Sequence, residues 1–207
     1  GLIMAVISNG TTIADAGSFS VGLGDMTLIK TITASSSSDI SFVHGSSSVV
    51  FDSTYPIYQI DIIQAHCSGD NQILQVGFRD GSSSYDATKT TAYYASQVKE
   101  DGTGGAVAYN TDQDQAQATG FLNISEALGA DNDQSTNGSI MIFNPSSTTF
   151  QKHFIARMTY NHQNDRVMDA YIGGYCNVTA AIDAVQFKMD SGNIDSGTFK
   201  LYGIKDS

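Results

Sequence analysis

Apolar side chains alternate with polar ones over short stretches throughout the chain. Tyr58, Ile60 and Ile62 alternate with Gln59 and Asp61. The same period of two runs through residues 74–79, 154–161, 185–189 and 199–202. Because successive side chains of a strand point to opposite faces of a sheet, each stretch predicts a strand with one buried and one wet face. No stretch of ten or more residues has the spacing of an amphipathic helix.

Runs rich in β-branched and aromatic residues predict further strands. They cover residues 27–33, 40–43, 49–51, 90–98, 119–124, 139–143 and 167–173. Roughly ten to twelve strands are too many for one open sheet to cover its own apolar face, and the absence of intervening helices argues against crossover units. We therefore expect an all-β fold, a jelly-roll-like antiparallel β-sandwich in which residues 27–207 form a single domain.

Turn-forming dipeptides lie between these stretches. Asp80-Gly81, Asn137-Gly138 and Asn144-Pro145 supply the left-handed or proline-restricted geometry that tight turns need. Both prolines, Pro56 and Pro145, lie at the edges of expected strands. Long polar surface loops are expected at residues 80–84, 99–105, 110–117 and 129–138.

The N-terminal residues 1–26 differ from the rest and predict an extended arm. We expect Met4 to be the natural first residue and residues 1–3 to be additional. Small residues separate the apolar anchors of the arm, which are Val6, Ile7, Phe19, Val21 and Leu23. Such a segment gains little alone, whereas adding a strand to a neighbour's sheet edge would bury its anchors.

The expected partner of this docking arm is another copy of the chain. Closed rotational symmetry is the natural way to repeat such a contact, and a homotrimer ranks first. The alternative interpretation of the same residues is an edge strand of the sandwich or a partly disordered leader.

Charge and composition exclude several classes of partner. Only 15% of residues are charged, and 21 acidic against 10 basic side chains leave a net charge of −11. That balance opposes binding to nucleic acid and to anionic membranes. No run approaches the ~20 apolar residues of a membrane helix, and no basic region followed by an apolar run marks a secretory signal.

The residue types that usually carry chemistry are scattered. Four histidines lack the spacing of a metal site, and we expect hydrogen-bonding roles in turns or on strand faces for His44, His66, His153 and His162. No nucleophile elbow surrounds any serine. Cys67 and Cys176 are expected to be buried free thiols rather than a disulfide pair.

Two acidic clusters are candidate calcium ligands, namely Asp112 with Asp114 and Asp131 with Asp133. The second loop departs from the EF-hand pattern, because Thr136 stands at its sixth position and Ile142 at its twelfth. We therefore expect solvated acidic loops. A glycosidase would need two carboxylates facing one another across a groove. No such pairing is visible in the sequence, so we expect no catalytic residue, no metal and no cofactor.

Several stretches resemble a family of small virion proteins encoded by tailed phages of marine bacteria, cyanophages and pelagic phages among them. The likeness covers nearly the whole chain and is weakest between residues 80 and 137. The stretches that carry it are 4–16, 28–38, 49–55, 143–149, 152–154, 181–183, 186–189, 191–194 and 201–204.

The resemblance implies a β-sandwich component of the virion that is made in the host bacterial cytoplasm and carries no catalytic motif. We expect a non-enzymatic structural protein, first of all a capsid decoration or cement subunit that binds the major capsid protein in many copies. One alternative is a tail-fibre or receptor-binding domain that contacts the host surface. A phage-borne carbohydrate-active enzyme is the third.

Overall fold

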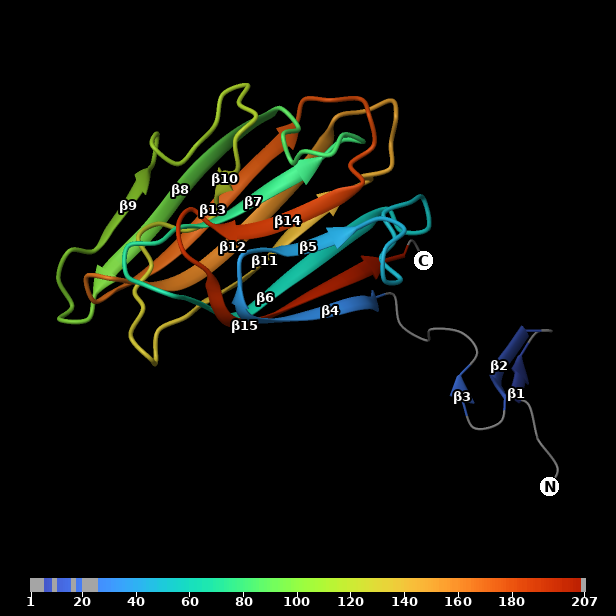
Figure 1. Cartoon of the computed structure of the whole chain (residues 1–207), viewed down its shortest axis with the longest axis horizontal. Helices are drawn as coiled ribbons and strands as arrows, with labels where there is room; N and C mark the ends of the chain where they lie inside the picture. Colours follow the sequence, from blue (N-terminus) through green and yellow to red (C-terminus); the bar gives the residue numbers. More distant parts are fainter. Residues whose placement is uncertain (1–5, 9–10, 16–17, 20–25, 206–207) are drawn as a thin grey trace.

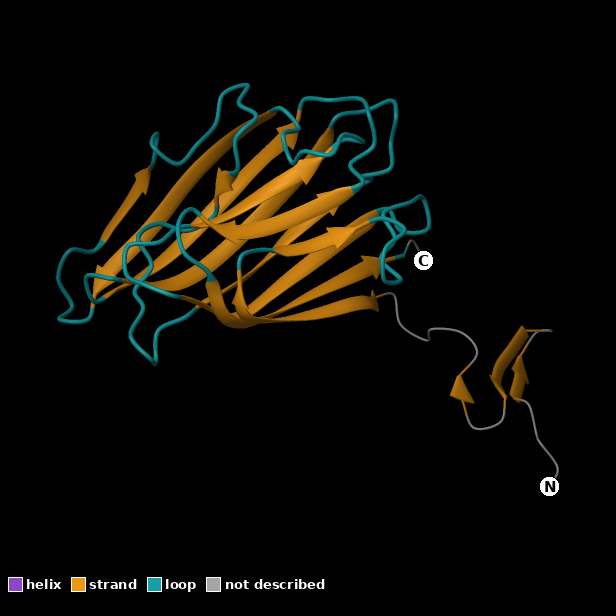
Figure 2. Cartoon of the chain, viewed as in Figure 1, coloured by secondary structure: helices purple, strands orange, loops and turns teal. Residues whose placement is uncertain are grey.

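The computed structural model describes residues 6–8, 11–15, 18–19 and 26–205. These residues form an all-β structure in which two antiparallel sheets pack face to face (Figure 1). Strands and loops account for all of it (Figure 2). Across the described ranges no helix is long and apolar enough to span a membrane. The expected antiparallel sandwich is therefore confirmed.

The larger sheet has eight strands. Its order is β4 (Met26–Ser37), β15 (Ile194–Ile204), β6 (Ile57–Cys67), β11 (Thr136–Phe143), β12 (Lys152–His162), β13 (Arg166–Cys176), β8 (Lys89–Lys99) and β9 (Ala106–Tyr109). The smaller sheet has the order β10 (Leu122–Asn123), β7 (Leu74–Arg79), β14 (Ala184–Met189) and β5 (Ile40–Val43).

Side-chain alternation along the strands decides which face of each sheet is buried. In β12, Phe154, Ala156 and Met158 are buried, whereas Ile155 and Arg157 between them are exposed. Since the side-chain period of a strand is two, one sheet face can be sealed while the other stays in solvent. The alternation in the sequence predicted β6, β7, β12 and β14 for this reason.

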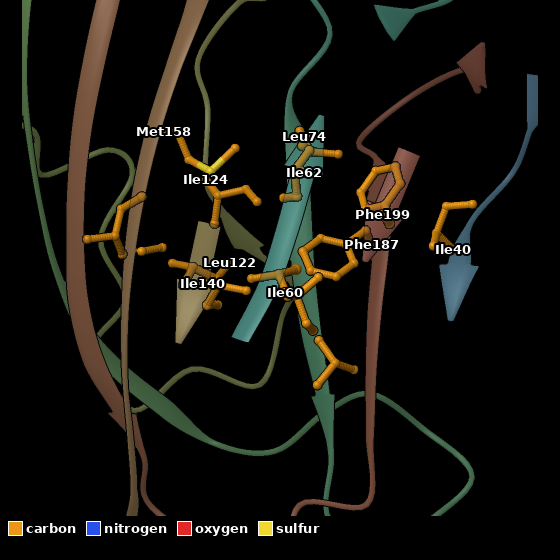
Figure 3. Close-up of a cluster of buried hydrophobic side chains, with 14 of the residues drawn as sticks. Ile40, Ile60, Ile62, Leu74, Leu122, Ile124, Ile140, Met158, Phe187 and Phe199 are labelled. Carbon is orange, nitrogen blue, oxygen red and sulfur yellow. The ribbon is translucent and has the colours of Figure 1, made fainter. Parts of the chain in front are cut away.

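The core lies between the two sheets (Figure 3). Phe187 of β14 packs against Phe199 of β15 with ring centroids 5.3 Å apart, and Phe78 of β7 packs against Phe154 at 4.9 Å. Each contact joins one sheet to the other. Burying a side chain of this size contributes about 1.5–3 kcal/mol, so these cross-sheet contacts are a main source of stability.

The Asn137-Gly138 turn is a wrong prediction, because both residues lie within β11. A Cβ at Gly138 would lie 2.2 Å from the backbone oxygen of Arg157. Glycine is needed here because the neighbouring strand passes so closely, and not because the chain turns. The other two turns are confirmed, with positive φ at Gly81 (93°) and Asn144 (45°).

Two predicted strands are absent or short. Residues 49–51 form no strand; Val49 and Phe51 are buried, and the Phe51 N–H donates to Nδ1 of His44 at 2.9 Å. Of residues 119–124, only the two of β10 pair with β7. In both places, apolar side chains enter the core from backbone that forms no regular strand, so the apolar pattern alone led to a strand prediction. The sequence analysis missed β9, which lies between two of the expected loops.

The described residues of the arm pair with one another. β1 (Val6–Ser8), β2 (Thr11–Asp15) and β3 (Ser18–Phe19) form a three-stranded antiparallel sheet. Among the described strands, these three pair with none of the sandwich. The arm therefore folds back into short hairpins rather than running as one extended strand, and these strands do not extend the edge of the sandwich.

We predict that Phe187→Ala lowers the free energy of unfolding by about 3–5 kcal/mol, because it leaves a cavity between the sheets. Chemical denaturation followed by circular dichroism measures this loss. Leu28→Ala is the control: Leu28 is 52% exposed on β4, and a change there is expected to stay within about 0.5 kcal/mol. Equal losses for the two variants would contradict the packing described above.

Candidate functional site

The outer face of the large sheet, opposite the core, carries exposed apolar side chains on β8, β12 and β13 and a half-buried methionine on β11. Ile155 is 50% exposed and Tyr94 is 46% exposed. We call this surface the outer platform and define it by Tyr94, Ser139, Met141, Ile155, Arg157, Asp169, Tyr171 and Gly173. Apolar side chains exposed together on one sheet face are a usual sign of a contact surface.

A stack of three side chains forms the ridge of the outer platform. Arg157, Tyr171 and Tyr94 lie opposite one another on the adjacent strands β12, β13 and β8. The two tyrosine rings are parallel, with centroids 5.0 Å apart, and the Arg157 guanidinium lies 4.7 Å from the centroid of Tyr171. Stacking and cation–π attraction hold the three side chains in fixed positions.

A carboxylate fixes the orientation of Arg157. The guanidinium donates to both carboxylate oxygens of Asp169, at 3.1 Å from Nε and 2.9 Å from an Nη. These bonds to Arg157 lower the pKa of the Asp169 carboxyl. The pair is partly open to solvent, so it orients the ridge more than it stabilises the fold.

A shallow depression of about 400 Å³ lies beside the ridge. Gly173 provides its floor, because a Cβ there would meet no atom within 4 Å. Ile155 is the cross-strand neighbour of Gly173 and lines one wall, with Met141 beyond it on β11. The depression can take a flat or apolar group against its aliphatic wall, with Arg157 available for hydrogen bonds at its rim.

The expected docking-arm residues belong to the N-terminal segment. Val6 and Ile7 belong to β1 and Phe19 belongs to β3. Val21 and Leu23 lie outside the described residues. The docking role of these residues remains a prediction.

The histidines have local structural roles. His44 accepts a hydrogen bond in a turn, and Nδ1 of His162 accepts one from the Asn164 N–H at 3.1 Å. His153 lies against the Tyr175 ring, and His66 contacts the backbone oxygen of Asp131 at 3.2 Å. The expected hydrogen-bonding roles are thus confirmed for His44, His66 and His162, whereas the contact found for His153 is with an aromatic ring.

The candidate calcium ligands are not assembled into a site. Asp114 accepts a hydrogen bond from the Tyr109 hydroxyl, while Asp112, Asp131 and Asp133 lie at exposed positions. Within residues 26–205 and the described arm segments, no three His, Cys, Asp or Glu side chains come together as a metal site would require.

The sequence analysis missed a buried polar cluster at one end of the sandwich. Cys176 at the end of β13 lies between Lys89 and Lys152 in the sheet register, and both lysines are fully buried. Their ammonium groups donate to the backbone oxygens of Ala87 at 2.7 Å and Val178 at 3.0 Å. Burial lowers the pKa of both lysines. The sequence contained a signal for this cluster, because the alternation along each strand places its lysine on the side that faces the core.

Neither cysteine is in a disulfide, and both thiols are buried. Burial raises the pKa of Cys176 to about 12, although the two lysines oppose that shift. Burial also raises the pKa of Cys67, whose thiol donates to the Gly129 oxygen at 3.4 Å. The expectation of free buried thiols is therefore confirmed.

Comparisons with protein-family models, with curated proteins and with solved structures found no match to this chain. We therefore infer the function from the outer platform, whose arrangement suits non-covalent binding, and from the resemblance carried by the sequence.

We predict that no thiol reacts quickly with a disulfide reagent such as DTNB in the folded protein at pH 8, and that both react after unfolding. At a pKa of about 12 the thiolate form of Cys176 is only about one in 10⁴ at that pH. Timed labelling, with Cys67→Ser to isolate Cys176, measures this. Fast stoichiometric labelling of the folded protein would contradict the burial of the thiols.

Proposed function

We propose that this chain is a non-enzymatic structural subunit of a tailed-phage virion, a decoration protein bound to the capsid surface in many copies. The resemblance to marine phage virion proteins supports the proposed location in a virion. The outer platform supports the binding role, because it is a broad, exposed and largely apolar sheet face. In this proposal the chain also associates with its own copies, through the arm and in a ring of three.

The observation that carries the proposal is the exposure of Ile155 and Tyr94, with the half-buried Met141, on one continuous sheet face. Exposed apolar area costs about 25 cal/mol per Å², and a partner that covers it recovers that free energy. Stable interfaces bury about 800 Å² per partner. A wide sheet face can supply such an area, and the ridge adds fixed polar groups that define orientation.

One observation favours receptor binding as a second candidate. The ridge places aromatic rings next to an arginine and a carboxylate, beside a shallow depression. Aromatic surfaces flanked by such hydrogen-bonding groups suit sugar rings, which have apolar faces and hydroxyl edges. A host-surface glycan bound at the platform would make the chain a tail-fibre or receptor-binding domain. Copy number in purified virions separates the two, with hundreds of copies for decoration and a tail-symmetry number for a fibre.

We predict that Ile155→Glu weakens binding to particles that lack the protein by at least about tenfold, because an unpaired charge in the contact costs more than the 1.4 kcal/mol that tenfold represents. Ser83→Glu, at an exposed position of the loop between β7 and β8, is the control and keeps full occupancy. Densitometry of purified particles gives the occupancy of each variant.

Unchanged occupancy for Ile155→Glu would remove the platform as the capsid contact. Glycan-array binding that Tyr94→Ala abolishes, in a protein absent from capsids, would establish the second candidate instead.

Deleting residues 1–25, which keeps β4 complete, is predicted to leave the sandwich folded and to reduce its retention on virions. The three strands of the arm pair among themselves and not with the sandwich. Their loss therefore removes no strand pairing from either sheet of the sandwich. Thermal unfolding checks the fold, and virion composition checks retention. Full occupancy by the truncated chain would show that the arm does not dock.

A further inference from the structure

The large sheet ends in an unprotected edge strand. Figure 1 shows β9 at the left end of the sheet with no strand beyond it, and all four of its residues are exposed. Val107 is 75% exposed and Tyr109 is 54% exposed. Edge strands are usually protected by charge, proline or a bulge, whereas the Ala-Val-Ala-Tyr sequence of β9 has no charge and no proline. Such an edge is a template for another strand.

The register of β9 on β8 identifies its free backbone groups. Tyr109 lies opposite Tyr94 and Ala108 opposite Ala95, and the Asn110 N–H donates to the Tyr93 oxygen at 2.9 Å. In an antiparallel pair, hydrogen-bonded and non-hydrogen-bonded residues alternate. Residues 106, 108 and 110 therefore bond to β8, while Val107 and Tyr109 direct their N–H and C=O groups away from it.

The same two residues carry the exposed apolar side chains. Val107 lies opposite Ser96, and Tyr109 lies opposite Tyr94 of the ridge, so both side chains stand on the outer face of the sheet. The free main-chain groups and the exposed apolar side chains thus belong to the same two residues. A strand added here would satisfy the first and cover the second in one contact.

We propose that two copies of the chain pair through β9, antiparallel, about a two-fold axis that passes beside Ala108. Val107 of each copy then lies opposite Tyr109 of the other, and each of these pairs exchanges both main-chain hydrogen bonds. Valine opposite tyrosine is a favourable cross-strand pair. The two eight-stranded sheets join into one continuous sheet, with the two outer platforms on the same face.

The sequence of β9 is complementary to itself in this register, which favours a second copy as the partner. The axis beside Ala108 pairs the two residues whose main-chain groups are free and whose side chains are exposed, so one strand supplies both sides of the contact. Centring the axis on Val107 instead leaves Tyr109 opposite Gly105, which lies outside the strand.

Cysteine cross-linking tests the register in the full-length protein. Ala108 would lie opposite itself across the axis as a non-hydrogen-bonded pair, where Cα atoms are about 4.5 Å apart and within disulfide range. Ala108→Cys is therefore expected to give a disulfide-linked dimer under mild oxidation, whereas Val107→Cys and the unmodified chain are not. Dimers from Val107→Cys alone would overturn the proposed register.

Sedimentation velocity tests the association itself. The unmodified chain is expected to double its mass as concentration rises, from a monomer to a dimer or from a ring of three to a pair of rings. Val107→Lys is expected to abolish this pairing by placing like charges beside the axis. Val167→Lys, on β13 and two strands away from β9, is the control and keeps this pairing. A monomeric unmodified chain with no Ala108→Cys cross-link would overturn the proposal. Either outcome is independent of the proposed virion role, because the platform and the arm take no part in the contact.

Discussion

The packing of the small sheet onto one face of the large sheet is the constraint on which the rest of the structure depends. It requires the large-sheet strands that the small sheet covers to alternate between core and solvent, and rings such as Phe187 and Phe199 hold the two layers together. Because one face is sealed, the other face is continuous and free. The outer platform is a direct consequence of that alternation. The position of each residue in its strand decides whether its side chain belongs to this face.

Two glycines show how the same residue type serves different purposes in one sheet. Gly138 allows the β12 backbone to approach closely, whereas Gly173 leaves an open floor on the outer face. The depression exists because a side chain is missing between Ile155 and Ala92 in the sheet row. Stacked side chains in the next row give that floor a rigid edge. Rigid, preformed surfaces of this kind bind with little loss of conformational freedom.

Strands with strict alternation were predictable from the sequence, and β12 is the clearest case. What the sequence could not provide was register. Asn137-Gly138 has a turn-like local sequence, but its glycine is required because the backbone of the neighbouring strand β12 lies too close for a side chain. The ridge could not be foreseen because Tyr94, Arg157 and Tyr171 become neighbours only once β8, β12 and β13 are aligned. The short strand β9 was missed since its four residues lie between glycines and a polar loop.

The central claim is that the outer platform is the surface by which this chain is held in a virion. A reconstruction of purified virions that resolves individual strands tests it most directly. Our account predicts many symmetry-related copies on the capsid, with Ile155 and Tyr94 covered by another protein. Copies whose outer face is turned to solvent, or virions that lack the chain, would contradict it.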